Sequence, residues 1–194
     1  MGAGTGVADA AFGVYDTGMS SLPAIPYVTE EEFLALPESS ERLELIDGEI
    51  ILSPSPSLNH QVAVGRLFRI LSAWADQQPP AVVCVSPLDV RLAPDRVLQP
   101  DVFVLLGGFP EDTSKVLSVA PDLVVEVMSQ RRTYDRMTKR LVYAEAGVTE
   151  YWIVDPYGRD IEVVRGLETI SRERETLRSA LLPGLQIDVP ALFL

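Results

Sequence analysis

Residues 99–106, QPDVFVLL, and residues 123–128, LVVEVM, decide the fold, because each is a short apolar run that contains one acidic residue. Both runs have the length and the valine-rich composition of a buried β-strand. The acid is Asp101 in the first run and Glu126 in the second. Because a carboxylate is rarely buried unless it is paired or coordinates a metal, we expect both acids to have a function.

The sequence on either side of these runs predicts an α/β (α+β) protein in which a mixed central β-sheet is flanked by helices. Apolar residues at helical spacing predict a helix over residues 58–77, and a second helix is expected over residues 133–146, where Gly147 can end it. Strands are expected near residues 81–92, 97–106, 121–128, 149–155, 160–165, 168–178 and 185–189.

The N-terminal region is predicted to contain a tail and then a short helix. Residues 1–26 are rich in Gly, Ala, Ser and Pro, so we expect a flexible tail. A capping box that begins at Thr29 predicts a short helix after it. We expect residues 27–194 to form a single domain.

An early β-hairpin is predicted by the Asp47-Gly48 pair, which lies between two apolar runs. A two-residue turn at this pair places Glu44 opposite Ile51 on the neighbouring strand. On strand alternation alone, Glu44 can face solvent at the edge of a sheet.

Composition limits the classes of function. The net charge of −12 and the pI near 4.5 argue against a general nucleic-acid binder, since affinity for phosphate comes mostly from clustered Lys and Arg. One histidine and one cysteine exclude a Cys/His zinc site, so any metal must be held by oxygen ligands, which favours Mg²⁺ or Mn²⁺. No apolar run is long enough for a membrane span, no signal peptide is evident, and we expect a cytoplasmic protein.

The second predicted helix presents two different faces. Asp135, Lys139 and Tyr143 follow one another at four-residue spacing, whereas Met137 and Leu141, with Ala144, lie on the opposite side and are expected to form its core stripe. Only two of the 16 basic residues are lysines, so a lysine at this position suggests a need for an ammonium that can release its proton.

The same segment is locally basic. Arg131, Arg132, Arg136 and Arg140 surround Lys139, against the single acid Asp135. In an acidic protein, such a patch is what an anionic substrate requires.

Each of these features also has a plainer interpretation. A Pro-Asp pair before an apolar run commonly marks only the start of a strand, and Lys139 with Asp135 can be a surface pair worth ~0.3 kcal/mol. His60 is expected to help start its helix or to bond locally to the Ser-Pro linker before it. Tyr143 is more often a core residue than a functional one.

Taken together, the acids and the lysine point to one chemistry. Cleavage of a phosphodiester needs stabilisation of charge on the attacking and leaving oxygens, which one or two carboxylate-bound Mg²⁺ ions can supply. A nearby lysine can position or deprotonate the attacking water. Asp101, Glu126 and Lys139 are therefore our candidate residues for a metal-dependent phosphodiesterase.

Motifs spread over most of the chain resemble a single bacterial family. They are ELIDGE (44–49), SPSP (53–56) with HQ (60–61), QPD (99–101), PDLVVEVMS (121–129), Asp135, Lys139, Tyr143, AGV (146–148), EYWIVD (150–155) and LPGL (182–185). In this order they resemble the Uma-two-type family, described as "putative restriction endonucleases", of the PD-(D/E)XK nuclease superfamily.

The resemblance implies a restriction-endonuclease-like core, Mg²⁺-dependent phosphodiester hydrolysis and frequent homodimers. It implies that Asp101 and Glu126 bind the metal and that Glu44 is an auxiliary acid from the hairpin. The superfamily pattern expects a lysine two residues after the second acid, where this chain has Met128. The resemblance then assigns the role of that lysine to Lys139.

Three hypotheses follow. The first is a Mg²⁺- or Mn²⁺-dependent DNA endonuclease, which could pair as a homodimer to cut both strands. The second is a catalytically silent nuclease-fold protein that acts as a binding or assembly module, for which Glu126 should be satisfied by hydrogen bonds and Lys139 should point to solvent. The third is a nuclease that acts on RNA or on another phosphoester.

Overall fold

The computed structural model describes residues 26–37, 41–53, 55–111, 115–128 and 132–194, without the side chains of residues 132–136. The tail expected over residues 1–26 lies outside the described residues, except for its last residue. The basic patch lies outside them too, apart from Lys139 and Arg140. Among the described residues, every helix falls short of the length and hydrophobicity that crossing a bilayer requires.

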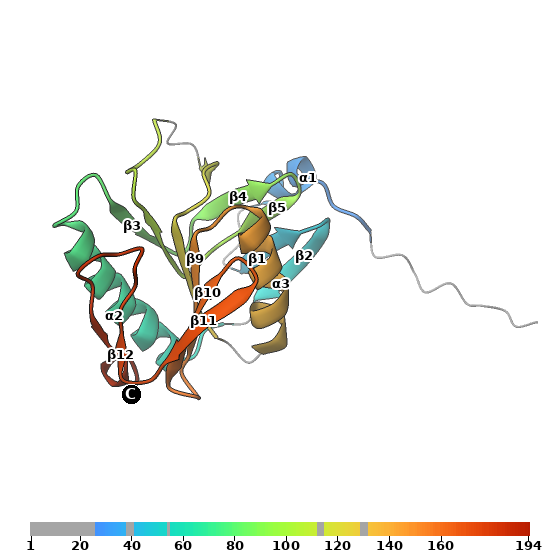
Figure 1. The fold of residues 1–194 in the computed structure, drawn as a ribbon. Helices are drawn as coiled ribbons and strands as arrows, with labels where there is room; N and C mark the ends of the chain where they lie inside the picture. The colour runs from blue at the N-terminus through green and yellow to red at the C-terminus, as the bar shows by residue number, and fades with distance from the viewer. Residues whose placement is uncertain (1–25, 38–40, 54, 112–114, 129–131) are drawn as a thin grey trace, which may run out of the picture.

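A six-stranded mixed sheet forms the centre of the described structure (Figure 1). Its strand order is β11-β10-β9-β8-β6-β3, and β8 and β9 run parallel while the other neighbours are antiparallel. The strands are β3 (Val82–Val85), β6 (Val102–Leu105), β8 (Leu123–Val127), β9 (Glu150–Asp155), β10 (Asp160–Arg165) and β11 (Glu168–Glu173). The mixed central sheet that the sequence predicts is confirmed.

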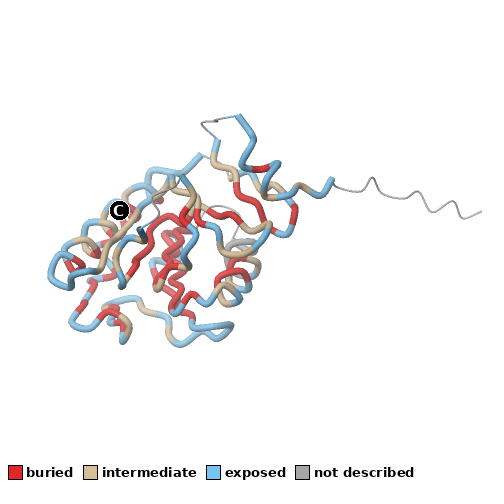
Figure 2. Tube along the Cα trace, turned by 90° about the horizontal axis from the view of Figure 1, so that it is seen from above, coloured by how far each residue is buried: buried red, intermediate tan, exposed pale blue. Residues whose placement is uncertain are grey.

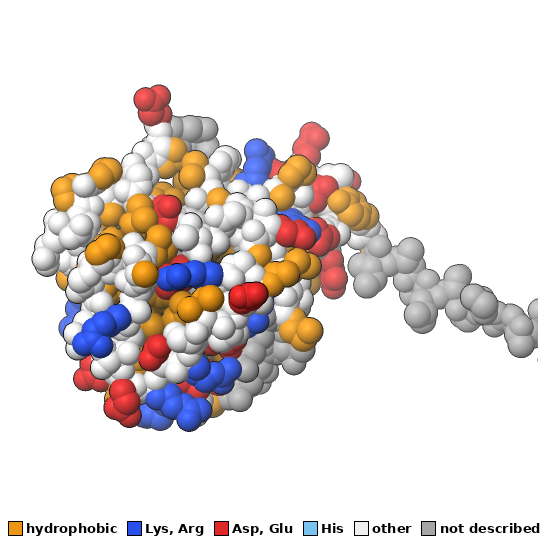
Figure 3. Space-filling model, in the orientation of Figure 1, with side chains coloured by type: hydrophobic (Ala, Val, Ile, Leu, Met, Phe, Trp, Pro, Cys, Tyr) orange, Lys and Arg blue, Asp and Glu red, His pale blue; other side chains and the backbone are white. Residues whose placement is uncertain are grey.

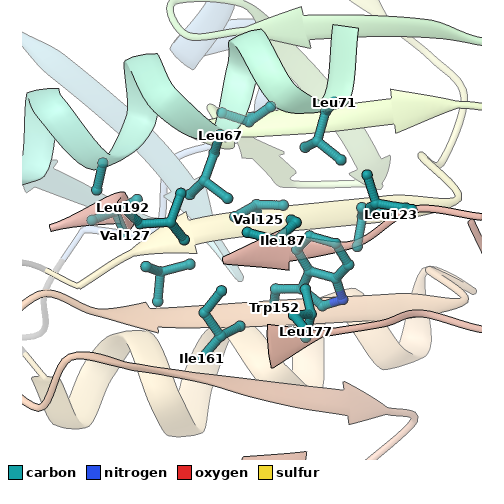
Figure 4. Packing of buried hydrophobic residues seen from close by; sticks show 14 of the residues in the cluster. Leu67, Leu71, Leu123, Val125, Val127, Trp152, Ile161, Leu177, Ile187 and Leu192 are labelled. Carbon is teal, nitrogen blue, oxygen red and sulfur yellow. The ribbon is translucent and has the colours of Figure 1, made fainter. Parts of the chain in front are cut away.

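Two helices cover opposite faces of this sheet: α2 (Leu58–Ala75) and α3 (Arg132–Glu145) (Figure 1). Leu67 and Leu71 of α2 pack with Val125 and Trp152 of the sheet in one buried hydrophobic cluster (Figure 4). Burial of this cluster, which provides the main hydrophobic stabilisation, is concentrated along the strands in the middle of the molecule (Figure 2).

A second sheet of five strands lies beside the first, with the order β2-β1-β5-β4-β7. Its strands are β1 (Arg42–Ile46), β2 (Glu49–Ser53), β4 (Asp89–Ala93), β5 (Arg96–Leu98) and β7 (Val116–Leu117). The hairpin β1–β2 has the predicted register, with Glu44 opposite Ile51. The predicted capping box at Thr29 is also present and begins α1 (Glu30–Leu34).

The chain crosses between the two sheets at two prolines. The sequence predicts one strand near 81–92 and one near 97–106, but each is divided into two strands that belong to different sheets. The breaks lie at Pro87 and Pro100, where proline has no N–H to continue a ladder of hydrogen bonds. At this crossing the Ser86 amide donates to the Asp101 carbonyl at 3.1 Å. Asp101 therefore lies at the joint between the sheets.

The predicted core stripe of α3 is wrong. Met137 is 70% exposed and Leu141 is 44% exposed, whereas Lys139 and Tyr143 are buried. The physical reason is that buried carboxylates lie beneath this helix, and a lysine that pairs with them can be buried at lower cost than an unpaired one. The helix ends as predicted, with Gly147 at φ +83° just beyond it.

The C-terminal segment packs against α2. Strands β12 (Thr176–Leu177) and β13 (Ile187–Asp188) form a small ladder, and the 3₁₀-helix η1 (Pro190–Leu192) follows it. The Trp74 indole N–H donates to the Pro183 carbonyl at 3.0 Å, which joins α2 to this segment.

Candidate functional site

The four residues that the sequence singles out lie together where the two sheets meet. Glu44 is on β1, Asp101 is at the crossing between β5 and β6, Glu126 is on β8 and Lys139 is on α3. None of them is more than 3% exposed. The interpretation of Glu44 as a solvent-facing edge residue is wrong, because the hairpin turns this face inward against the six-stranded sheet.

Lys139 bridges two of the acids. Its Nζ lies 3.0 Å from Glu44 Oε1 and 2.8 Å from Glu126 Oε1. One helical turn further along α3, the Tyr143 hydroxyl donates to Glu126 Oε1 at 2.6 Å. The four-residue spacing of Lys139 and Tyr143 thus directs two donors at one carboxylate, which was not expected from a tyrosine interpreted as core.

Asp101 is held by groups from three other elements. Its Oδ2 accepts the amide N–H of Val127 on β8 at 2.8 Å and lies 3.1 Å from His60 Nε2 on α2. Its Oδ1 lies 2.6 Å from Arg42 Nη1. The His60 amide does bond locally to Ser57 Oγ at 3.3 Å, as expected at the start of a helix, but its imidazole belongs to the site.

Arg42 is a second residue of the site, besides His60, that sequence reasoning missed. Its Nη2 lies 3.5 Å from Glu44 Oε1 and 3.6 Å from Glu126 Oε2, and it also donates to the Gln99 carbonyl. With the contact to Asp101, one guanidinium faces three carboxylates. The signal was present, because residues two apart on a strand share a face and Arg42 precedes Glu44 by two positions.

The site contains more acids than permanently charged bases. Glu44, Asp101 and Glu126 face the two cations Arg42 and Lys139. Burial raises the pKa of Glu126 to about 7, because Lys139 and Arg42 only partly offset desolvation and the neighbouring charges of Asp101 and Glu44. This acid is therefore easily protonated in the metal-free protein.

Asp101 and Lys139, in contrast to Glu126, stay ionised. Burial alone would raise the pKa of Asp101, but the His60 hydrogen bond and the Arg42 charge lower it overall. Burial alone would lower the pKa of Lys139, but the charges of Glu126 and Glu44 raise it overall. Lys139 is thus an ammonium at neutral pH.

A cavity of about 790 Å³ opens onto these residues. Arg42, His60, Asp101, Glu126 and Lys139 line it, together with Ser53, Ser55, Pro56 and Ser57 before α2. Nearby Arg140 is not available to a ligand there, because it pairs with Glu162. Figure 3 shows the same mixing of Lys and Arg with Asp and Glu over the face that carries α3, β10 and β11.

The carboxylate oxygens of the site are the type of ligand that a hard divalent cation prefers. Mg²⁺ is commonly held by one or two carboxylates and completes its coordination with water and substrate phosphate. Asp101 and Glu126 already face one common cation, the Arg42 guanidinium, which stands where an ion would be attracted. In this arrangement no three His, Cys, Asp or Glu side chains among the described residues are grouped closely enough to hold a metal by themselves.

The fold, with a buried Asp, Glu and Lys at the joint of a mixed sheet, defines a restriction-endonuclease-like protein. Residues 30–190 match the Uma2 family, which is described as "putative restriction endonuclease". The chain belongs to this family, as the resemblance of its motifs predicts.

The structural comparison agrees on the fold. A crystal structure described as "a putative nuclease belonging to DUF820", from Anabaena variabilis, matches with a TM-score of 0.75 and 23% sequence identity. The match covers 86% of this chain and 97% of that chain. At this identity the likeness concerns the fold alone. No match is found among curated proteins.

Proposed function

We propose that this protein is a Mg²⁺- or Mn²⁺-dependent DNA endonuclease whose site is Asp101, Glu126, Lys139 and Glu44. The observation that carries the proposal is the buried ammonium of Lys139 between Glu44 and Glu126, beside Asp101 and open to the cavity. A buried cluster of three acids is costly to keep for stability alone, which supports a chemical role.

Each residue has a distinct role in the proposal. Asp101 and Glu126 hold the ion, which supplies Lewis-acid stabilisation of charge on the phosphate oxygens. Lys139 stays protonated, so it orients the attacking water and neutralises developing charge rather than removing a proton. Glu44 keeps the ammonium in place through its 3.0 Å contact.

The charge of the site supports a role for a metal. When all three carboxylates are ionised they outnumber the two fixed cations, so a bound divalent ion would help the cavity attract a phosphodiester. The family membership supports a nucleic acid as substrate. A protein with one site per chain would cut both strands of a duplex as a homodimer, which light scattering of the purified protein can test.

Cleavage of plasmid DNA tests the proposal. The protein should cut supercoiled or single-stranded DNA with Mg²⁺ or Mn²⁺ and be inactive in EDTA. Asp101→Asn should abolish cleavage, with unchanged circular dichroism, because it removes a charged ligand while preserving its shape. Faster cleavage of an RNA of the same sequence would reassign the substrate, and no cleavage of either nucleic acid would overturn the proposal.

A second candidate is a silent binding module, which one observation favours. The acids of the site are all paired with cations or hydrogen-bond donors. However, this candidate predicted that Lys139 points to solvent, and Lys139 is buried. The absence of both cleavage and calorimetric Mn²⁺ binding would select this candidate.

A further inference from the structure

Arg42 is held in the site mainly by the acids themselves. Its guanidinium contacts Asp101, Glu126 and Glu44, and it also donates a hydrogen bond to the Gln99 carbonyl. Its Nε is buried and has no hydrogen-bond partner in the described part of the structure. A guanidinium that depends on carboxylates for its position is free to move once another cation neutralises them.

Its location differs from that of the other cation. Both side chains line the cavity, but that of Arg42 is 23% exposed, whereas that of Lys139 on α3 is only 4% exposed. Arg42 can therefore withdraw toward the cavity without opening the core. Lys139, which is almost completely buried, is held more tightly.

The guanidinium and a metal ion compete for the same oxygens. Arg42 Nη1 lies 2.6 Å from Asp101 Oδ1, and Nη2 faces Glu126 Oε2 at 3.6 Å. An ion bound to these two carboxylates would meet both the volume of the guanidinium and its positive charge. In a site screened poorly by water, two such charges repel strongly.

We propose that Arg42 occupies the cation position of the metal-free site and that metal binding displaces it. This inference rests on the proposed metal site. Arg42 is then a positioning residue that keeps the acids together without metal and sets the metal concentration at which the site loads. In consequence, loss of the guanidinium tightens metal binding, although it removes a stabilising contact from the metal-free protein.

Isothermal calorimetry with Mn²⁺ alone tests this inference. Arg42→Met should bind Mn²⁺ at least about tenfold more tightly than the unaltered protein, which corresponds to about 1.4 kcal/mol. Mn²⁺ should also raise the thermal midpoint of the variant by more than that of the unaltered protein, because the ion replaces the missing charge. Arg42→Lys keeps the charge but loses the planar contacts, so its affinity should lie between the two.

Arg165→Met is the matched control. Arg165 pairs at 3.3 Å with Glu150, which is also fully buried, but it lies outside the site. Its loss should leave Mn²⁺ affinity unchanged. If Arg42→Met does not fold, tighter binding by Arg42→Lys than by the unaltered protein carries the same conclusion.

The outcomes separate this inference from the proposed function. Equal or weaker Mn²⁺ binding by the Arg42 variants, with cleavage by the unaltered protein intact, overturns only the role of Arg42. Absence of Mn²⁺ binding by every protein overturns both.

Discussion

Glu126 and Glu150 are buried glutamates on the neighbouring strands β8 and β9, yet their surroundings differ. Glu150 accepts hydrogen bonds from the Trp152 indole at 2.8 Å and the Ser179 hydroxyl at 3.0 Å, and it pairs with Arg165. Within the described residues, these three partners of Glu150 pair with no other acid. Glu126 shares its two cations with further carboxylates.

The difference separates a structural acid from a candidate functional one. An acid with its own donors can be buried as part of the architecture, because each lone pair it loses to water is satisfied. The pKa of Glu126 rises to about 7, first because burial desolvates the acid and then because the like charges of Asp101 and Glu44 crowd it. Crowding of acids, rather than burial alone, distinguishes the site.

Activity should separate the two acids most strongly. Glu126→Gln should lower the rate of metal-dependent DNA cleavage by about a thousandfold, or about 4 kcal/mol of transition-state stabilisation, because it removes a charged metal ligand. Glu150→Gln should retain cleavage to within a few fold. The measurement is the rate of plasmid nicking by the two variants under the same conditions. Equal losses of activity in both variants would refute the distinction between a structural and a functional acid.

The loss of unfolding free energy should differ between the cations that pair with these two acids. Lys139→Met should cost about 3–5 kcal/mol of unfolding free energy, since it leaves Glu44 and Glu126 buried without their bridging charge. Arg165→Met should cost no more than about 1 kcal/mol, because Arg165 is partly solvated and Glu150 keeps two other donors. Urea unfolding at pH 8 in EDTA measures both losses.

The same contrast should appear as a pH dependence of stability. The pKa of Glu126 is about 7 in the folded protein against its usual 4.5, so the folded state holds this proton over that interval and the unfolded state does not. Stability of the metal-free protein should therefore fall as pH rises from about 4.5 to about 7, by up to about 3 kcal/mol.

Glu126→Gln removes this titrating group. As pH rises, the free energy of unfolding of the unaltered protein should therefore fall relative to that of the variant. The urea midpoints of both proteins, measured at pH 5 and pH 8, test this expectation. If the midpoint of Glu126→Gln differs from that of the unaltered protein by the same amount at both pH values, the raised pKa of Glu126 is contradicted.

The smallest effect is expected at His60. His60→Phe removes one of the groups that contact Asp101, while the Val127 amide and Arg42 remain. The loss of unfolding free energy should be about 1 kcal/mol. A loss as large as that from Lys139→Met would show that the imidazole holds Asp101 more firmly than its other partners do.

The sequence indicated the acids well and their partners poorly. Asp101 and Glu126 could be found because the apolar residues around them predict buried strands. The face of α3 could not be predicted, because whether Lys139 is buried depends on acids from strands far away in the sequence. Arg42 was missed although strand spacing places it on the same face as Glu44, and His60 was missed because its role arises only when α2 packs against Asp101.

The two prolines that pass the chain between the sheets have a consequence for the nascent protein. Because Asp101 lies at that joint, Glu44 on one sheet and Glu126 on the other come within reach of it only after both sheets have docked. A partly synthesised or partly unfolded chain therefore holds these acids apart. The acid cluster forms only in molecules that have completed folding.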